Sequence, residues 1–338
     1  MTFDWSTAMD QLNEYLPQLD QLLESSEGDK ASYLHPKRKN LGSVSLVLLR
    51  EAIAPLVIRN AEQEITDIEF HGDTWVRAVP NKFKYPERGR GLQILRAMKA
   101  GGRWPQNRTA IPKGAKASES FDLNTLVFGD SANHDSKVLP VRAAVNYSDA
   151  LSLRPKFYCV GESFHNRGFE DGTLWDSEAK KNTDNLFSRH FVSPSTLLVQ
   201  VLSTRGKLLP PIGLKHLLLS VGLAGSYGGQ TAVTGINVRT HVVGLYADWF
   251  EQAITSPYEL LKAVGSNEPM TVEAAKAALD AVLKPAHRTG IPGAAVQTWV
   301  NGLINGFNEP GGALEQEYQG AAEAMVRLFD GWFEPAKK

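Results

Sequence analysis

Apolar and polar positions divide the chain into a strand-rich part and a helical part. Three early segments are rich in Val, Leu and Ile or partly alternate with polar residues, as strands do: 42–58, 65–70 and 75–79. Further strands are expected at 138–146, 156–161, 191–203 and 236–246. After Thr255 the apolar spacing becomes helical, which predicts helices over 271–283, 293–307 and 313–333. This order favours an α+β fold over a doubly wound parallel sheet.

Shorter patterns predict three more helices and one projection. Residues 1–30 form an acidic amphipathic segment with apolar positions at helical spacing, which predicts an N-terminal helix. Helical patterns also cover 91–99, ending at Gly101-Gly102, and 211–221, followed by a glycine-rich segment at 222–235. Residues 163–190 interrupt the strand pattern with glycines and mixed charges, which is typical of an inserted hairpin or a projecting loop.

Charge is concentrated in one stretch, Trp75 to Ser118. It holds eleven Lys and Arg residues and one acid, Glu87, although the formal net charge of the chain is only -1. Aromatic residues such as Tyr85 and Trp104 lie among the cations, a mixture that suits phosphates and stacked bases. The alternative is a solvated polar loop, but such surfaces usually interleave both signs. From His241 to the C-terminus the chain is acidic, with twelve carboxylates against seven Lys and Arg.

Composition argues against several classes of protein. The N-terminus lacks the basic and apolar pattern of a secretory signal, and the longest apolar runs are interrupted, as by Arg50, Glu51 and Pro55, so no membrane span is expected. A single cysteine, Cys159, excludes an internal disulfide and a Cys-rich zinc site and is expected to be buried in a strand. We therefore expect a cytoplasmic protein of 338 residues without a metal or cofactor.

The glycine-rich segment allows two interpretations. Glycines let backbone N–H groups approach an anion closely, but a helix precedes this segment and a strand follows, the reverse of a dinucleotide-binding motif. The segment is therefore either a tight helix-to-strand turn or a backbone contact with nucleic acid. Asn237, Arg239 and His241 alternate on one face of the following strand, which favours the contact.

Two carboxylates near the basic stretch, Asp122 and Asp130, are the candidates for catalysis. Asp122 precedes the apolar block 123–128 and suits an N-cap as well as it suits chemistry. The dipeptide His134-Asp135 alone does not make a metal site, because metal chemistry needs several converging ligands.

Three segments carry a resemblance to a known family: KYPERGRG at 84–91, SFDLNTLVFGD at 120–130 and GSYGGQTAVTGINVR at 225–239. They resemble the repeat-associated RNA-binding (RAMP) superfamily of CRISPR effector proteins, and more narrowly the seven-family backbone subunit of a type I-D Cascade complex. The resemblance implies a modified RNA-recognition (ferredoxin-like) palm over 31–254, with a basic finger-like insertion at 71–135 and a thumb-like hairpin at 163–190. The N-terminal helix at 1–30 and a helical module at 255–338 complete this organisation. Some relatives hold zinc through cysteines in their insertions, which Cys159 alone cannot do.

The family resemblance also implies a function. Copies would polymerise along a CRISPR guide RNA, present it for pairing with target DNA, and contact other Cascade subunits. The RNA contacts are expected at Arg77, Lys82, Lys84, Tyr85, Arg88, Arg90, Arg96, Lys99, Arg103, Arg108, Lys113, Lys116, Gly225, Tyr227, Gly228, Gly229, Asn237 and Arg239. Two alternatives remain open: a backbone subunit that also cleaves the target strand, through Asp122 or Asp130, and a free-standing single-strand-binding protein.

Overall fold

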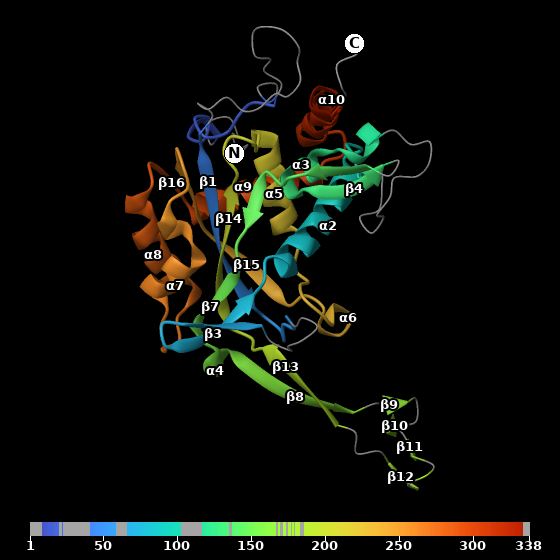
Figure 1. The fold of residues 1–338 in the computed structure, drawn as a ribbon, viewed down its shortest axis with the longest axis vertical. Coiled ribbons are helices and arrows are strands. Elements are labelled where there is room, and N and C mark those ends of the chain that lie inside the picture. The colour runs from blue at the N-terminus through green and yellow to red at the C-terminus, as the bar shows by residue number, and fades with distance from the viewer. Residues whose placement is uncertain are drawn as a thin grey trace.

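A single large antiparallel sheet organises the protein (Figure 1). The computed structural model describes residues 9–19, 22, 41–58, 66–102, 117–134, 137–166, 168–169, 172–173, 175–176, 178, 180–182 and 186–333. The strands of the sheet follow the order β16-β15-β1-β14-β7-β3-β2, and β6 pairs with β14 beside β7. These strands are β1 (Ser43–Ala52), β2 (Asp67–Phe70), β3 (Asp73–Ala78), β6 (Val145–Tyr147), β7 (Ala150–Pro155), β14 (Leu197–Thr204), β15 (Val238–Asp248) and β16 (Thr289–Pro292).

One face of the sheet is covered by α2, α3, α5, α9 and α10. These helices are α2 (Asn81–Ala97), α3 (Leu123–Phe128), α5 (Pro211–Gly222), α9 (Gly293–Phe307) and α10 (Ala313–Phe333). Their apolar side chains share one core with Leu46 and Leu48 of β1 and with Leu12 and Leu16 of the N-terminal segment. The N-terminal segment therefore packs on its own chain.

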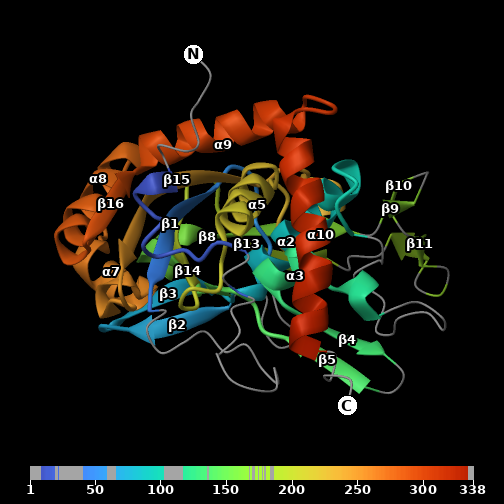
Figure 2. The same cartoon turned by 90° about the horizontal axis from the view of Figure 1, so that it is seen from above.

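The opposite face is covered by α7 (Pro257–Val264) and α8 (Val272–Leu283), as Figure 2 shows. Val47 and Leu49 of β1 point into this second core. Burial on both faces explains why β1 is a nearly continuous apolar run instead of an alternating one. Because helices cover both faces, the broad faces of this sheet are not open to a ligand.

A long hairpin projects from the lower end of the sheet in Figure 1. It is built from β8 (Val160–Asn166) and β13 (Leu186–Val192), which pair antiparallel with each other. Short strands lie toward its tip: β9 (Gly168–Phe169), β10 (Gly172–Thr173), β11 (Trp175–Asp176) and β12 (Lys181–Asn182). The predicted projection at 163–190 is thus a hairpin, called the thumb hairpin below.

The remaining elements are short. Within the described residues they are β4 (Asp130–His134), β5 (Lys137–Val141), α4 (Lys156–Cys159), α6 (Thr231–Thr234) and three 3-10 turns at Ala117–Ser120, Ala253–Thr255 and Lys284–Ala286.

Several predicted elements are confirmed and others need correction. The helices at 293–307 and 313–333 have the predicted bounds, and α5 and α8 differ by one residue at one end. The strand expected at 156–161 is wrong for its first four residues, which form the turn of α4, so Cys159 is buried but not in a strand; residues 160 and 161 begin β8. Between α8 and α9 the chain forms β16, which pairs with β15.

The basic region at 71–135 was expected to be an insertion, but its first half belongs to the body of the protein. β3 pairs with both β2 and β7 in the main sheet. α2 begins at Asn81 instead of Gly91 and buries Phe83, Ile94 and Leu95 against the sheet and its covering helices. The cations from Lys82 to Arg96 therefore lie on α2, a helix packed in the core, and not on a projecting loop.

Candidate nucleic-acid interface

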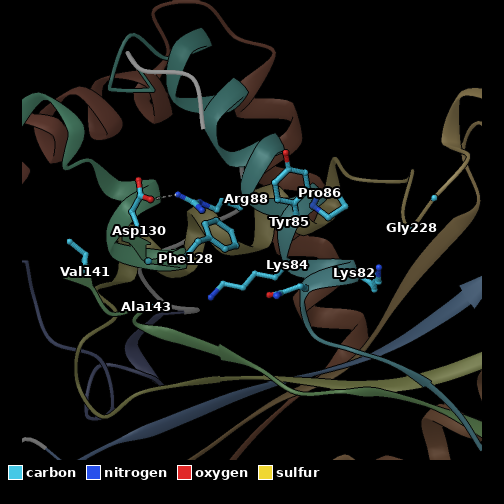
Figure 3. Close-up of a pocket in the computed structure, with 13 residues that line it drawn as sticks. Lys82, Lys84, Tyr85, Pro86, Arg88, Phe128, Asp130, Val141, Ala143 and Gly228 are labelled. Carbon is cyan, nitrogen blue, oxygen red and sulfur yellow. Dashed lines mark ion pairs between the residues drawn. The ribbon is translucent and has the colours of Figure 1, made fainter. Parts of the chain in front are cut away.

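A groove of about 820 Å³ crosses the first turns of α2. Figure 3 shows Asp130, Val141 and Ala143 on one side of α2 and Gly228 of the glycine-rich segment on the other. The lining residues are Asn81, Lys82, Lys84, Tyr85, Pro86, Arg88, Phe128, Gly129, Asp130, Val141, Ala143, Gly228 and Gly229. The groove thus joins two segments that lie far apart in the sequence and that were both expected to contact RNA.

Cations and one exposed ring of α2 face this groove. Lys82, Lys84 and Arg88 are half-buried, whereas the Tyr85 ring is 66% exposed. Arg88 forms an ion pair with Asp130 at 2.9 Å. Burial, and secondarily the charge of Arg88, lower the pKa of Lys84. A phosphate beside Lys84 would stabilise the charged form of the side chain and so oppose both effects.

The local sequence explains why α2 presents these cations. The helix starts after Pro80, and its apolar positions Phe83, Leu92, Ile94 and Leu95 are buried. The cationic positions between them lie at least partly at the surface, whereas the acid Glu87 is buried. The rigid helix therefore fixes the separation of its cations.

Glycines are required where the glycine-rich segment packs on the chain after β1. Gly228 has φ +74°, and a Cβ there would lie 2.2 Å from the Val57 carbonyl oxygen. The Gly229 N–H donates to that same oxygen at 2.8 Å. The tight-turn interpretation therefore explains Gly228, while the position of both glycines on the groove is compatible with a backbone contact.

Two predicted RNA contacts need correction because their side chains are buried. Tyr227 and Asn237 are both 0% exposed. The Asn237 side chain accepts from the Tyr227 N–H at 2.9 Å and donates to the Tyr227 carbonyl at 2.8 Å. These side chains hold the glycine-rich segment in shape and do not face a ligand.

The other predicted contacts are divided among several places. Arg90, Gly225 and Arg239 line a second groove of about 600 Å³ between α5, α9 and the edge of the glycine-rich segment. Arg77 lies on β3 and pairs with Asp149 at 2.8 Å, a hydrogen bond that raises the pKa of Arg77. Arg103, Arg108, Lys113 and Lys116 lie outside the described residues.

Arg96 and Lys99 stand at the far end of α2 from the groove. The Arg96 Nε donates to the Gly102 carbonyl at 2.6 Å, which closes the turn after the helix. Lys99 has φ +55°, is 80% exposed and lies 3.8 Å from Glu315. Neither residue lines the main groove.

The candidate catalytic carboxylates are occupied by structural contacts. One oxygen of Asp122 accepts from the Thr125 N–H and the other from the Gly102 N–H, each at 2.9 Å, so Asp122 is the N-cap of α3. Burial raises the pKa of Asp122, although these hydrogen bonds oppose the shift. Within the described residues, no group of three or more His, Cys, Asp or Glu side chains is arranged to hold a metal ion. Asp135 lies outside the described residues.

Several residues that line the groove were not among the predicted contacts. Asn81, Phe128, Val141 and Ala143 line it, but nothing in their local pattern distinguishes them. A stronger signal was available at Arg50, a charged residue inside the apolar run of β1, which predicts a buried partner. That partner is Glu87, the single acid of the basic stretch, at 2.7 Å with both side chains 0% exposed.

Comparisons with known proteins place this fold and surface in context. A family model described as Csc2 Crispr matches residues 50–302. The crystal structure of Thermofilum pendens Csc2 is similar in fold over 97% of this chain and 99% of that chain, with a TM-score of 0.58 and 17% identity. A structure titled "CRISPR RNA-guided surveillance complex, pre-nicking" covers 72% of this chain and 88% of its own, with a TM-score of 0.49 and 8% identity. A search of curated proteins finds no match.

Among the helices in the described part of the chain, none combines the length and the apolar character needed to cross a bilayer.

Proposed function

The chain belongs to the Csc2 CRISPR family, and on that premise we propose which of its surfaces holds the guide RNA. As a member of this family it is a backbone subunit of a Cascade ribonucleoprotein complex and binds guide RNA. The proposed binding surface is the groove across α2, from Asp130 to the glycine-rich segment, continued by Arg90 and Arg239.

The observation that carries this proposal is the convergence of cations and an exposed ring in one groove that also reaches the glycine-rich segment. Lys82, Lys84 and Arg88 supply positive charge, and Tyr85 supplies a face on which a base can stack. Such groups bind a phosphate backbone without reading its bases, which leaves sequence recognition to pairing between guide and target.

We also propose that the centre of the sheet is the RNA-recognition (ferredoxin-like) palm. Strands β15-β1-β14-β7 lie side by side and antiparallel in this order. α2 follows β1 along the chain, α5 connects β14 to β15, and both helices lie on the same face. This connectivity is that of a split βαβ fold and supports the assignment.

The thumb hairpin is placed to contact the guide RNA or a neighbouring copy of the protein. It extends away from the sheet and carries exposed aromatic side chains, Phe164 at 65% and Trp175 at 60%. We assign to it the thumb role that the family resemblance implies, and propose that copies follow one another along the guide within a type I-D complex that pairs it with target DNA.

Salt-dependent RNA binding tests the groove. In the variant Lys82→Ala/Lys84→Ala/Arg90→Ala, three cations of the surface are lost while the Arg88 to Asp130 ion pair remains. We expect affinity for a guide-length single-stranded RNA to fall about tenfold or more, and the slope of log K against log salt to flatten by about 2. Filter binding or fluorescence anisotropy over a salt series measures both.

Exposed cations of the helical module provide the matched control. The variant Lys262→Ala/Lys284→Ala/Arg327→Ala removes the same charge from α7, the turn after α8, and α10. Its RNA affinity and slope should stay close to those of the unaltered protein. Equal losses in the two triple variants would show that net charge matters and the groove does not.

A further inference from the structure

Beneath the main groove, one buried carboxylate contacts both of its ends. Glu87 lies on α2 between Lys84 and Arg88 and is 0% exposed. Its Oε1 accepts from the Tyr227 hydroxyl at 2.9 Å, and its Oε2 accepts from the Tyr147 hydroxyl at 2.6 Å. Tyr227 immediately precedes Gly228 and Gly229 at one end of the groove, while Tyr147 follows Val141 and Ala143 at the other.

Arg50 anchors this carboxylate to three neighbouring strands. Its NH1 lies 2.7 Å from Glu87 Oε1 and donates to Thr240 of β15 at 2.8 Å, while its Nε donates to Gln200 of β14 at 3.0 Å. The guanidinium also lies 4.8 Å from the centre of the Phe83 ring. Glu87 is therefore held from the sheet side by a partner that is itself fixed.

A buried ion pair such as Arg50–Glu87 is an unusual way to stabilise a core. Removing two charges from water is costly, and a buried ion pair is often replaceable by apolar residues without loss of stability. The Arg50 NH2 is buried without a hydrogen-bond partner among the described residues, which adds to that cost. What the pair offers instead is directional bonding, because each carboxylate oxygen points to a different hydroxyl.

Both hydroxyls are held as donors. Burial, and next the charge of Glu87, raise the pKa of Tyr147 and of Tyr227 well above the usual value. Each tyrosine therefore stays protonated at neutral pH and donates a hydrogen bond to the carboxylate.

We propose that Glu87 is a positioning residue that sets the span of the RNA groove, holding the glycine-rich segment through Tyr227 and the β5–β6 end through Tyr147. This inference rests on the proposed function of the groove. A groove fixed before RNA arrives does not lose the freedom of its two ends on binding, so its affinity is higher than that of a loose groove with the same charges.

Single hydroxyl deletions test this role with little risk to folding. Tyr227→Phe and Tyr147→Phe each remove one bond to Glu87 and keep the ring. The matched control is Tyr318→Phe, which removes the hydroxyl of a ring as buried as Tyr227; this hydroxyl contacts His216 in the covering helices, and Tyr318 does not line the groove. The measurements are RNA affinity over a salt series and hydrogen exchange of the segments 225–235 and 141–148.

We expect each groove-side variant to lose about fivefold in RNA affinity, the worth of one hydrogen bond, with the salt slope unchanged because no charge is removed. Tyr227→Phe should speed exchange in 225–235, where the Gly229 N–H is bonded to Val57, and Tyr147→Phe should speed exchange in 141–148. Tyr318→Phe should leave affinity within about twofold and exchange in both segments unchanged.

Three results would overturn the inference. Tyr227→Phe and Tyr147→Phe could bind as tightly as the unaltered protein while the triple Lys/Arg variant binds weakly, which would leave the groove in place and remove the positioning role. Losses equal to that of Tyr318→Phe would show a general effect of stability. If the triple Lys/Arg variant binds RNA normally, the groove is not the RNA-binding surface. That conclusion would hold whatever hydrogen exchange shows for the segments 225–235 and 141–148.

Discussion

Glu87 changes the charge that the basic stretch presents to solvent. In the sequence it offsets one of eleven cations, but in the structure it is buried and paired with Arg50, which lies outside the stretch. The surface of α2 is therefore more positive than the count of charges along the stretch suggests. A residue's contribution to a surface depends on where its side chain points, which charge counts do not include.

His216 makes stability depend on pH. It is 0% exposed, with its ring nitrogens 3.1 Å from the Tyr318 hydroxyl and from the Asn124 side-chain oxygen. Burial lowers the pKa of His216 to about 3. In the unfolded chain His216 binds a proton near pH 6.5, whereas in the folded protein it stays neutral until the pH is near 3. Its contribution to the free energy of unfolding is therefore fully present above pH 6.5 and is lost as the pH falls toward 3.

The expected size is about 1.4 kcal/mol per pH unit below 6.5, or about 2 kcal/mol at pH 5. Urea unfolding at pH 7 and pH 5 measures it when the protein is compared with His216→Gln, which cannot titrate. The variant should lose about 2 kcal/mol less than the unaltered protein over this interval. Equal losses in both would show that His216 does not contribute to the pH dependence.

At the scale of elements, α2 is defined by its contacts with α3 and α5 as well as by its surface cations. Gly91 leaves no room for a side chain between α2 and these helices: a Cβ there would lie 2.2 Å from Asn124 Oδ1 and 2.8 Å from His216 Nε2. The glycine therefore serves packing, although it lowers the intrinsic helix propensity of α2.

A pair of identical substitutions tests this packing. Gly91→Ala should destabilise the protein by about 1–3 kcal/mol, because the added methyl group overpacks the contact with α3 and α5. Gly320→Ala, in the exposed interior of α10 with open space around it, should stabilise by up to about 1 kcal/mol through helix propensity alone. Thermal and urea unfolding measure both, and opposite signs are the expected result. If both substitutions stabilise, helix packing does not explain Gly91.

At the scale of the molecule, the thumb hairpin is separate from the cores that hold the fold together. Of the described residues between 163 and 190, none belongs to the buried apolar clusters, whereas Cys159 and Val192 at its base do. The body of the protein is thus complete without the hairpin, and its length is available for contact with RNA or a neighbouring copy.

Replacing the hairpin tests this division of roles. Glu162 and His190 are directly paired, so an Asn-Gly turn can join them in place of residues 163–189. We expect the melting temperature to change by no more than about 3 °C, because no core residue is lost. The number of copies bound per guide-length RNA, measured by light scattering, should fall. A large drop in melting temperature, or an unchanged number of copies, would contradict the assignment.

Local patterns in the sequence were sufficient for the long helices and for the concentration of charge. Helical spacing placed Gly293–Phe307 and Ala313–Phe333 correctly, since a helix is read from residues three and four apart. The same spacing recognised only the second half of α2, because its first turns are rich in cations and contain Pro86. The first part of the strand expected at 156–161 was also wrong, because so short an apolar run fits a strand or a helical turn equally well.

The sequence by itself determined that this protein carries a dense basic segment, a glycine-rich segment and a segment that interrupts the strand pattern, because each is a property of neighbouring residues. Only the tertiary structure decided which of these residues share a surface. It brought Lys84 and Gly228 to one groove, turned Tyr227 and Asn237 inward, and joined Arg50 to Glu87 beneath them. The physical reason is that a groove and a buried ion pair depend on contacts between distant segments, which local periodicity and charge do not encode.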